Sequence, residues 1–223
     1  MNCSRQPAEE IETAYRTTEA AAWVRACFPD ISAVDDHEQV AQARQHGLDL
    51  HMFKRVRLMP RVMSALGLVK GLAPTDLLDI GTGRGSFLWP LLDDLPELPV
   101  TCVDLDSLAV ERIEAVAKVR QAKLRGHVMD VTNLDFDNDS FDCVTFLETL
   151  EHIPHPETAM REALRVARRW LVLSVPSEPD ENPEHIHLFT EEHLRNLVGS
   201  AGGRITKIKR VPGHWISLIS PSP

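Results

Sequence analysis

The chain has 223 residues, of which 43% are hydrophobic and 26% charged, as is typical of a soluble globular protein with room for one sizeable α/β domain and an appendage. The formal net charge of −9 disfavours a general electrostatic grip on nucleic acid, although a local basic patch stays possible. No apolar run approaches the roughly 20 residues that a membrane helix needs, and the N-terminus lacks a signal-peptide pattern. The four cysteines are scattered without a C-x-x-C pair, so we expect a reduced, cytoplasmic setting.

The first 72 residues are predicted to form a helical cap. Apolar residues recur at helical spacing over 8–28, and a second helix is expected from Asp35 or Asp36 to Gln45. A third helical stretch covers about 51–70, where Pro60 predicts either a kink or two shorter helices.

Two features of this cap have a structural and a functional interpretation. One side of the third stretch carries a basic stripe formed by Lys54, Arg57 and Arg61. This stripe is either a solvated helix face or a contact for an anionic substrate. Tyr15, the only tyrosine, either packs in the core or closes a ligand pocket.

From about residue 75 the pattern changes to alternating strands and helices. The expected strands are 76–80, 99–104, 125–129, 141–147 and 170–175, and the expected helices are 85–95, 107–120, 156–169 and 190–201. Two more strands, 203–211 and 214–220, are separated by a turn at Pro212-Gly213. This order predicts an α/β fold with a doubly wound, mostly parallel seven-stranded sheet, a terminal antiparallel hairpin and the N-terminal helical cap. The expected domains are 1–72 and 73–223.

A glycine-rich turn follows the first expected strand, in the stretch Leu77–Phe87. Its order is D-x-G-x-G-x-G from Asp79, and position 86 is Ser rather than the third small residue of a dinucleotide fingerprint. The Gly-Lys-Ser/Thr of a phosphate loop is absent from the sequence. Glycines allow close approach of a ligand, and the free N–H groups of the next helix attract anionic groups.

The ordered set of motifs resembles the class I S-adenosylmethionine (SAM)-dependent methyltransferases, in the broad type 11 group that includes the quinone-biosynthesis enzymes. The resemblance covers about residues 75–220 and rests on Leu77–Phe87, on the acidic end of strand 99–104, on His127–Val131, on Phe141–Glu148 and on Leu150–Pro154. It implies that SAM is the cofactor and that the chain is a methyltransferase.

The resemblance also implies how the cofactor is held. Asp104, 23 residues after Gly81, accepts the ribose hydroxyls, and its structural alternative is a helix cap, a role that Asp106 or Ser107 fills better. Asp130 and Val131 contact the adenine edge, and Leu105 and Val131 its faces. The residues expected along the methionine half are Asp79, Gly81, Thr82, Gly83, Gly85 and Leu147.

His152 and Glu148 are the expected catalytic residues, because both follow the fourth strand where the transferred methyl group would point. A histidine near neutral pKa suits deprotonation of a hydroxyl, so oxygen is the preferred methyl acceptor atom on an unidentified small molecule. The structural alternative is that His152 only shapes its loop. No metal is expected at this site, and the oligomeric state is open.

Two other functions stay open. Glu148-x-x-Glu151-His152, with His185 or His187 downstream, resembles the metal site of small-RNA 3′-terminal 2′-O-methyltransferases. On a helical turn these three side chains would share one face and suit Mg²⁺ or Mn²⁺. The other alternative is a non-catalytic regulator that binds SAM or a nucleotide.

Overall fold

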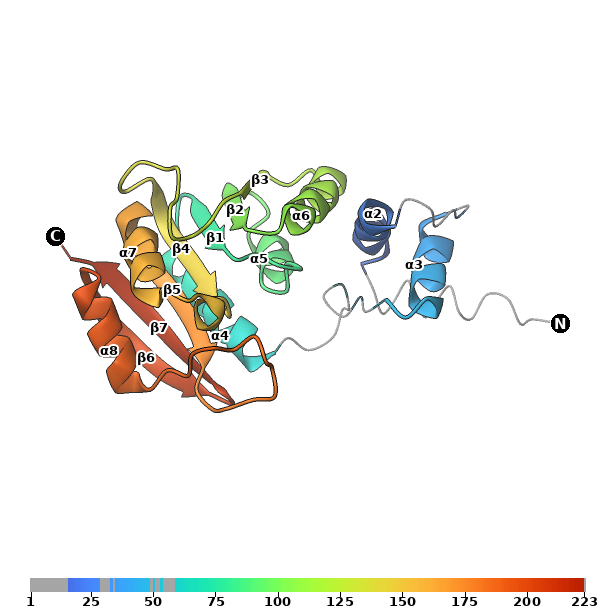
Figure 1. The fold of residues 1–223 in the computed structure, drawn as a ribbon. Coiled ribbons are helices and arrows are strands. Elements are labelled where there is room, and N and C mark those ends of the chain that lie inside the picture. Colours follow the sequence, from blue (N-terminus) through green and yellow to red (C-terminus); the bar gives the residue numbers. More distant parts are fainter. Residues whose placement is uncertain are drawn as a thin grey trace.

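A seven-stranded sheet forms the centre of the fold (Figure 1). The computed structural model describes residues 16–28, 33, 35–48, 50, 53 and 59–222. The strands are β1 (Leu77–Ile80), β2 (Val100–Asp104), β3 (Leu124–Val128), β4 (Phe141–Leu147), β5 (Ala167–Pro176), β6 (Gly203–Val211) and β7 (His214–Pro221). The helices are α2 (Thr17–Cys27), α3 (Asp36–Gln45), α4 (Pro60–Leu72), α5 (Leu88–Asp94), α6 (Ser107–Arg120), α7 (Pro156–Val166) and α8 (Glu191–Ser200), with a 3₁₀ turn η2 at Leu150–His152.

The strand order β3-β2-β1-β4-β5-β7-β6 confirms the predicted doubly wound sheet. Strands β1 to β5 are parallel, whereas β7 runs antiparallel to both β5 and β6. The chain builds outward from β1 to β3 and then returns to place β4 on the other side of β1. In such sheets the crevice for a ligand lies at the carboxyl ends of the strands where this reversal occurs.

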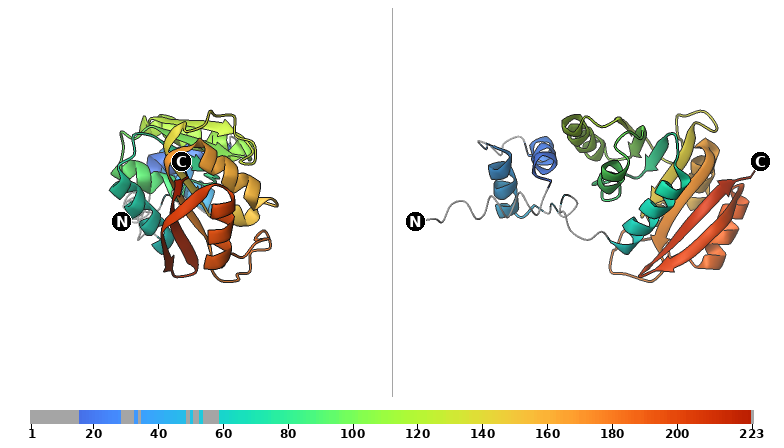
Figure 2. Two further views of the ribbon diagram at one scale, coloured as in Figure 1. Left: turned by 90° about the vertical axis from the view of Figure 1, so that its left-hand side faces the viewer. Right: turned by 180° about the vertical axis from the view of Figure 1, so that it is seen from behind.

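Both faces of the sheet are buried under helices (Figure 2). Along β1, Leu77 belongs to the core on the side of α4, α5 and α6, while Leu78 belongs to the core under α7 and α8. Cys143 and Val144 alternate in the same way on β4. Because successive side chains of a strand point to opposite faces, continuous apolar strands of this kind are what two helical layers require.

The N-terminal helices α2 and α3 lie on the side of α5 and α6 that faces away from the terminal hairpin (Figures 1 and 2). The Phe53 ring packs between Trp23 of α2 and Trp89 of α5, with ring centroids 5.9 and 6.1 Å apart. Arg120 of α6 pairs with Glu19 and Asp93. Aromatic packing and ion pairs therefore attach this part of the cap to the sheet-covering helices. Helix α4 ends at Leu72, and the division into two domains at that residue stays a prediction.

Several predicted boundaries were wrong for local reasons. Helix α5 begins at Leu88 rather than residue 85, because Gly85 has φ +75°, which a right-handed helix cannot contain. Pro60 begins α4, the position where its missing N–H is harmless, so the alternative of a helix kinked at Pro60 is wrong. The other alternative, two shorter helices, rests on residues 51–58, most of which lie outside the described residues. Gly71, expected to lie beyond this helix, lies inside it, and the following Ala73 takes the left-handed conformation that ends it.

The junction of α7 and β5 also differs from the prediction. The helix was expected to reach residue 169, but it ends at Val166 and β5 starts at Ala167. Ala167 pairs with Phe141 of β4, and Arg169 forms an ion pair with Asp142. Pairing with a neighbouring strand thus decides this boundary, since the sequence has no glycine or proline there to stop the helix.

Two of the cysteines belong to the core, and the predicted turn at Pro212-Gly213 is confirmed. Cys102 and Cys143 are buried within β2 and β4, where a thiol packs as a small hydrophobic group. Gly213, with φ +76°, forms the turn between β6 and β7. Among the residues that the structure describes, no helix combines the length and apolar character needed to cross a membrane.

Arg165 of α7 holds the chain between β3 and β4 in place. Its guanidinium donates to the carbonyls of Leu134 and Phe136 at 2.9 and 2.6 Å, and to both carboxylate oxygens of Glu162. Glu162 in turn accepts the Leu134 N–H at 3.0 Å. This network fixes the segment whose first residues form one wall of the crevice described below.

We expect Arg165→Ala to lower the free energy of unfolding by about 2–3 kcal/mol, because part-buried carbonyls and a carboxylate lose charge-assisted partners. The measurement is urea denaturation. The matched control is Arg161→Ala on the exposed side of the same helix, which should change stability by less than about 0.5 kcal/mol. Equal effects of the two variants would contradict the role given to Arg165.

Candidate functional site

The loops after β1 and β4 meet at Gly81. Its backbone has φ +70°, and a Cβ added there would lie 2.2 Å from Thr149 Oγ1. Glycine is therefore required both for the backbone conformation and for the approach of the neighbouring loop. Gly85 has a different neighbour: a Cβ there would lie 2.5 Å from the indole nitrogen of Trp89, and the residue lines neither of the two pockets described below.

Asp104 connects the glycine loop to the end of β2. One carboxylate oxygen accepts the Gly83 N–H at 2.8 Å and the other accepts the Asp106 N–H at 3.0 Å. The helix cap predicted for Asp106 is confirmed, since its carboxylate accepts the Leu108 N–H at the start of α6. Asp104 is thus held in place by backbone donors at the mouth of the crevice.

Asp79 lies deeper, on β1. Its carboxylate is buried and accepts a 2.6 Å hydrogen bond from the Thr145 hydroxyl. Burial raises the pKa of Asp79 to about 6, because a charged carboxylate loses its hydration there. Thr82 donates to the Asp79 carbonyl at 3.2 Å, so this predicted residue supports the start of the loop.

The residues predicted for the adenine end lie at the opposite end of the crevice. Asp130 follows β3 and accepts hydrogen bonds from the Thr132 N–H and hydroxyl, both at 2.8 Å, through the same oxygen. Leu105 is 71% exposed although it is a large apolar side chain, while Val131 is buried. An exposed leucine at the edge of a cavity is what a flat ligand would cover.

Glu148 directly follows Leu147, the last residue of β4, and has the left-handed φ of +52°. This conformation is uncommon for a residue with a side chain, and it persists where the surroundings fix it. Three side chains hold the carboxylate: the Ser174 hydroxyl at 2.5 Å, His214 Nε2 at 2.8 Å and Arg61 Nε at 3.4 Å.

Two of these partners, Ser174 and His214, were missed from the sequence. The only signals were a serine within the apolar run of β5 and a histidine just after the hairpin glycine. Arg61 was noticed in the basic stripe, and it does reach the crevice. Tyr15, Lys54 and Arg57 lie outside the described residues.

Two pockets, of about 210 and 820 Å³, occupy the crevice and share Gly81, Gly83 and Glu148. The smaller is also lined by Met59, Arg61, Val62, Asp79, Thr82, Leu147 and Ser174, among others. The larger includes Asp104, Leu105, Asp130, Val131, Thr149, His152 and Glu184. The crevice therefore consists of two adjoining pockets, and acidic side chains line both of them.

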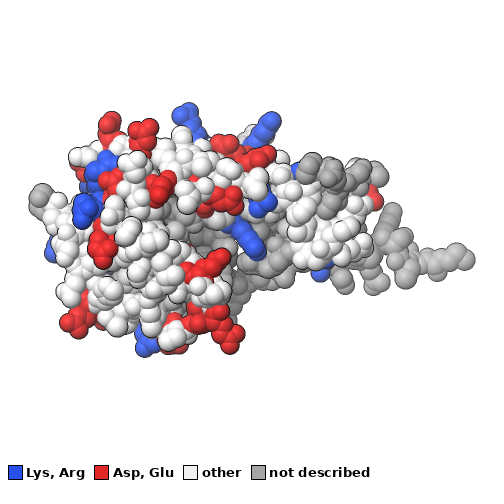
Figure 3. Space-filling model, in the orientation of Figure 1, with Lys and Arg blue, Asp and Glu red and all other residues white. Residues whose placement is uncertain are grey.

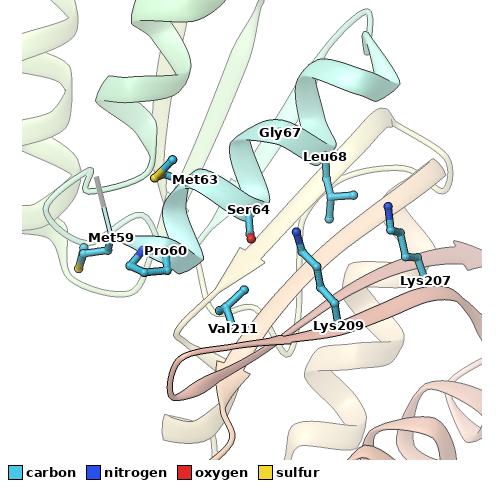
Figure 4. Close-up of a pocket in the computed structure, with 9 residues that line it drawn as sticks. All are labelled: Met59, Pro60, Met63, Ser64, Gly67, Leu68, Lys207, Lys209 and Val211. Atoms are coloured by element: carbon cyan, nitrogen blue, oxygen red, sulfur yellow. The ribbon is translucent and has the colours of Figure 1, made fainter. Parts of the chain in front are cut away.

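A third hollow, of about 920 Å³, lies between α4 and β6 (Figure 4). Met63 and Leu68 line it from the helix, and the Lys207 and Lys209 side chains extend toward it from the strand. Met59 belongs both to this hollow and to the smaller pocket of the crevice. The two spaces therefore adjoin at the start of α4.

The metal triad of the RNA-methyltransferase alternative does not form on one helical face. Glu148 lies before the 3₁₀ turn and its left-handed backbone directs it into the crevice, so Glu148, Glu151 and His152 do not share a helical face. Among the described residues the group with metal-ligand geometry is Glu151, His152 and His185. His187 instead places Nε2 against the Ile153 carbonyl, at 3.0 Å.

The charge of the surface agrees with the composition. Figure 3 shows Asp and Glu side chains dispersed over the described part of one face, with Lys and Arg in smaller groups between them. On that described face there is no continuous basic surface of the kind that follows a nucleic-acid backbone.

Comparisons with known proteins agree with this architecture. Residues 77–170 match the methyltransferase-domain family. Over 145 residues the chain is 30% identical to a malonyl-[acyl-carrier protein] O-methyltransferase of Geobacter sulfurreducens, covering 59% of this chain and 49% of that one. Over 93 residues it is 38% identical to a demethylmenaquinone methyltransferase of Roseiflexus castenholzii, covering 41% and 37%. The chain thus spans about half or less of the length of these two relatives.

A solved structure extends the likeness to the N-terminal part. The 1,6-didemethyltoxoflavin-N1-methyltransferase of Burkholderia thailandensis, with bound 1,6-didemethyltoxoflavin and S-adenosylhomocysteine, superposes with a TM-score of 0.64 at 21% identity. The match covers 93% of this chain and 91% of that one. The fold is therefore shared over nearly the whole length.

The raised pKa of Asp79 makes stability depend on pH. Between about pH 4 and 6 the folded protein holds a proton on Asp79 that the unfolded chain has released, so stability falls as pH rises through this window. Asp79→Asn keeps an oxygen for the Thr145 hydroxyl but cannot ionise. We expect the variant to gain about 2–3 kcal/mol relative to the native chain between pH 4 and pH 7.

Urea denaturation at several pH values checks this expectation. Asp106→Asn is the control, because asparagine caps a helix as well as aspartate does and the side chain is exposed. A difference between Asp79→Asn and the native chain that stays constant with pH would contradict the assignment.

Proposed function

We propose that the chain, whose residues 77–170 match the methyltransferase-domain family, is a SAM-dependent enzyme that methylates a small-molecule acceptor at oxygen. The observation that carries the proposal is the pair of adjoining pockets at the switch point of the sheet, with buried Asp79 in the smaller pocket and Asp104 and Asp130 in the larger. Residues 1–72 are proposed to act as a cap on this domain.

The residues present fit the proposed cofactor. SAM supplies a methyl group on a positively charged sulfur, and its methionine half also carries an ammonium group. Asp79 and Glu148 place negative charge in the smaller pocket, which favours a cationic ligand. The neighbour with bound S-adenosylhomocysteine supports the same cofactor for this fold.

Each end of the crevice has groups suited to one half of SAM. Asp104 keeps lone pairs for ribose hydroxyls after accepting two backbone N–H groups. Asp130 keeps a carboxylate oxygen for the adenine amine, and Leu105 and Val131 would cover the ring. Along the methionine half we propose Asp79, Gly81, Thr82, Gly83 and Leu147, which all line the smaller pocket. Gly85 supports the loop through its packing on Trp89.

The acceptor is proposed to enter from the α4 side of the smaller pocket. Met59, Arg61 and Val62 form that wall, so the cap contributes α4 to the acceptor pocket. Glu148 would accept a hydrogen bond from the hydroxyl group of the substrate and so orient the hydroxyl oxygen. Ser174, His214 and Arg61 keep the Glu148 carboxylate fixed. Alignment of the reacting atoms is the main contribution a protein can make to methyl transfer. The role of His152 as a base stays a prediction.

Small organic acceptors are named for the demethylmenaquinone and didemethyltoxoflavin relatives, which supports an acceptor of this class. The RNA and regulator alternatives become outcomes of the experiments below. The first would show labelled RNA, and the second would show binding of SAM without any turnover.

Calorimetric titration with SAM tests the cofactor assignment. We expect Asp104→Asn to weaken SAM binding by about 10- to 100-fold, because a charged acceptor of hydrogen bonds is lost. Asp106→Asn makes the same change of charge two residues away and should alter the affinity less than about threefold. Absence of SAM binding by the native chain would overturn the proposed function, and equal effects of both variants would overturn the ribose assignment.

Transfer of a radioactive methyl group from SAM tests the acceptor class. The chain is incubated with a cell extract separated by a filter into small molecules and retained macromolecules, and label is expected in the small-molecule fraction. Glu148→Gln should reduce this transfer by at least about tenfold with little change in SAM affinity, because the orienting carboxylate is lost.

Glu192→Gln, an exposed change on α8, is the control for the loss of one negative charge. Label confined to RNA in the retained fraction would contradict the small-molecule assignment. Full transfer by Glu148→Gln would contradict the role proposed for this side chain.

A further inference from the structure

The turn after β4 and the segment between β5 and α8 meet at Glu151. The Glu151 carbonyl accepts the N–H groups of Ile186 and His187, at 3.0 and 3.2 Å. The His187 ring adds a contact to the Ile153 carbonyl at 3.0 Å. These contacts hold two segments that are more than thirty residues apart in a fixed relation, and they bring the side chains of Glu151, His152 and His185 together.

The Glu151 carboxylate is buried without a hydrogen-bond partner among the described residues. The residue is 0% exposed, and neither carboxylate oxygen has a hydrogen-bond partner among the described atoms. Nε2 of His185 lies 3.9 Å from Oε1 of Glu151, beyond hydrogen-bond distance. Glu148, three residues earlier, has three partners. A buried carboxylate without partners is unfavourable unless a cation or a proton compensates for the lost hydration.

The two histidines are oriented by their outer nitrogens. His152 Nδ1 lies 3.0 Å from the Glu184 carbonyl, and His185 Nδ1 lies 2.8 Å from the Asp180 carboxylate. Since both partners are acceptors, each Nδ1 carries the hydrogen and a neutral ring keeps its lone pair on Nε2. Metal-binding histidines are typically fixed by such a carbonyl or carboxylate. The ligand-forming atoms of Glu151, His152 and His185 lie within 4.8 Å of one another.

We propose that Glu151, His152 and His185 bind one divalent transition-metal ion, with Asp180 as the positioning residue of His185. Two imidazoles and one carboxylate favour ions such as Zn²⁺ or Co²⁺ over Mg²⁺ and Ca²⁺, which prefer oxygen ligands. Three protein ligands leave a further coordination position open. The set differs from the one suggested by the sequence pattern, because Glu148 takes no part in it.

The site lies in the wall of the larger pocket, since His152 and Glu184 line that pocket. A bound ion would join the turn η2 to the segment that contains Asp180 and His185, and so fix this wall. It would also occupy the lone pair with which His152 could deprotonate an acceptor. The proposal does not depend on methyl transfer, because it concerns binding of an ion by residues outside the smaller pocket.

Visible absorption during a Co²⁺ titration tests the site directly. The chain, free of any affinity tag and stripped with a chelator, should bind one equivalent of Co²⁺ with absorption bands of a ligated ion, and Zn²⁺ should displace it. Glu151→Gln should weaken binding by at least about 100-fold, because the one anionic ligand is lost. Asp180→Asn should weaken it by about 10- to 100-fold through the orientation of His185.

His155→Ala is the matched control, since it removes an exposed imidazole from the same loop, and it should leave the affinity within about twofold. Glu151→Gln removes an unpaired buried charge and is expected to fold, which circular dichroism verifies. Asp180→Asn changes a partly exposed side chain, so it tests the metal site even if Glu151→Gln does not fold. Co²⁺ binding that is absent, unaffected by both variants, lost in His155→Ala or matched by Mg²⁺ would overturn the proposal.

Discussion

The close approach of the loop after β4 to Gly81 is the constraint on which the crevice depends. A side chain at position 81 would collide with Thr149, and the backbone there is left-handed. This contact places the end of β1 beside Glu148 at the point where the strand order reverses. Both pockets of the crevice include Gly81 and Glu148, so their shared wall exists only because position 81 has no side chain.

The acidic groups of the crevice are fixed before any ligand arrives. Asp104 is held by two backbone N–H groups and Asp130 by Thr132, while Glu148 is held by side chains from three other elements. The Asp79 carboxylate accepts a hydrogen bond from the Thr145 hydroxyl, and burial raises its pKa. A cationic ligand would therefore meet oriented carboxylates, and little reorganisation would be needed on binding.

Glu148 and Glu151 show how one turn can place two nearby carboxylates in different surroundings. The left-handed backbone at Glu148 sends its side chain into the crevice, where it is fully partnered. The 3₁₀ turn that follows places Glu151 in the interior, without hydrogen bonds and near two imidazoles. The first carboxylate therefore lines the crevice, and the second lies behind its wall, where we propose the metal site.

The sequence by itself determined the order of the elements and the edge at which the site forms. Alternating apolar runs predicted the parallel strands, and residues that follow such strands, including Asp104, Asp130 and Glu148, must gather at one edge of the sheet. Only the tertiary structure decided the partners of these residues. His214 reaches Glu148 from the last strand, and His185 reaches Glu151 from a loop, because contacts between distant segments depend on packing that local patterns do not encode.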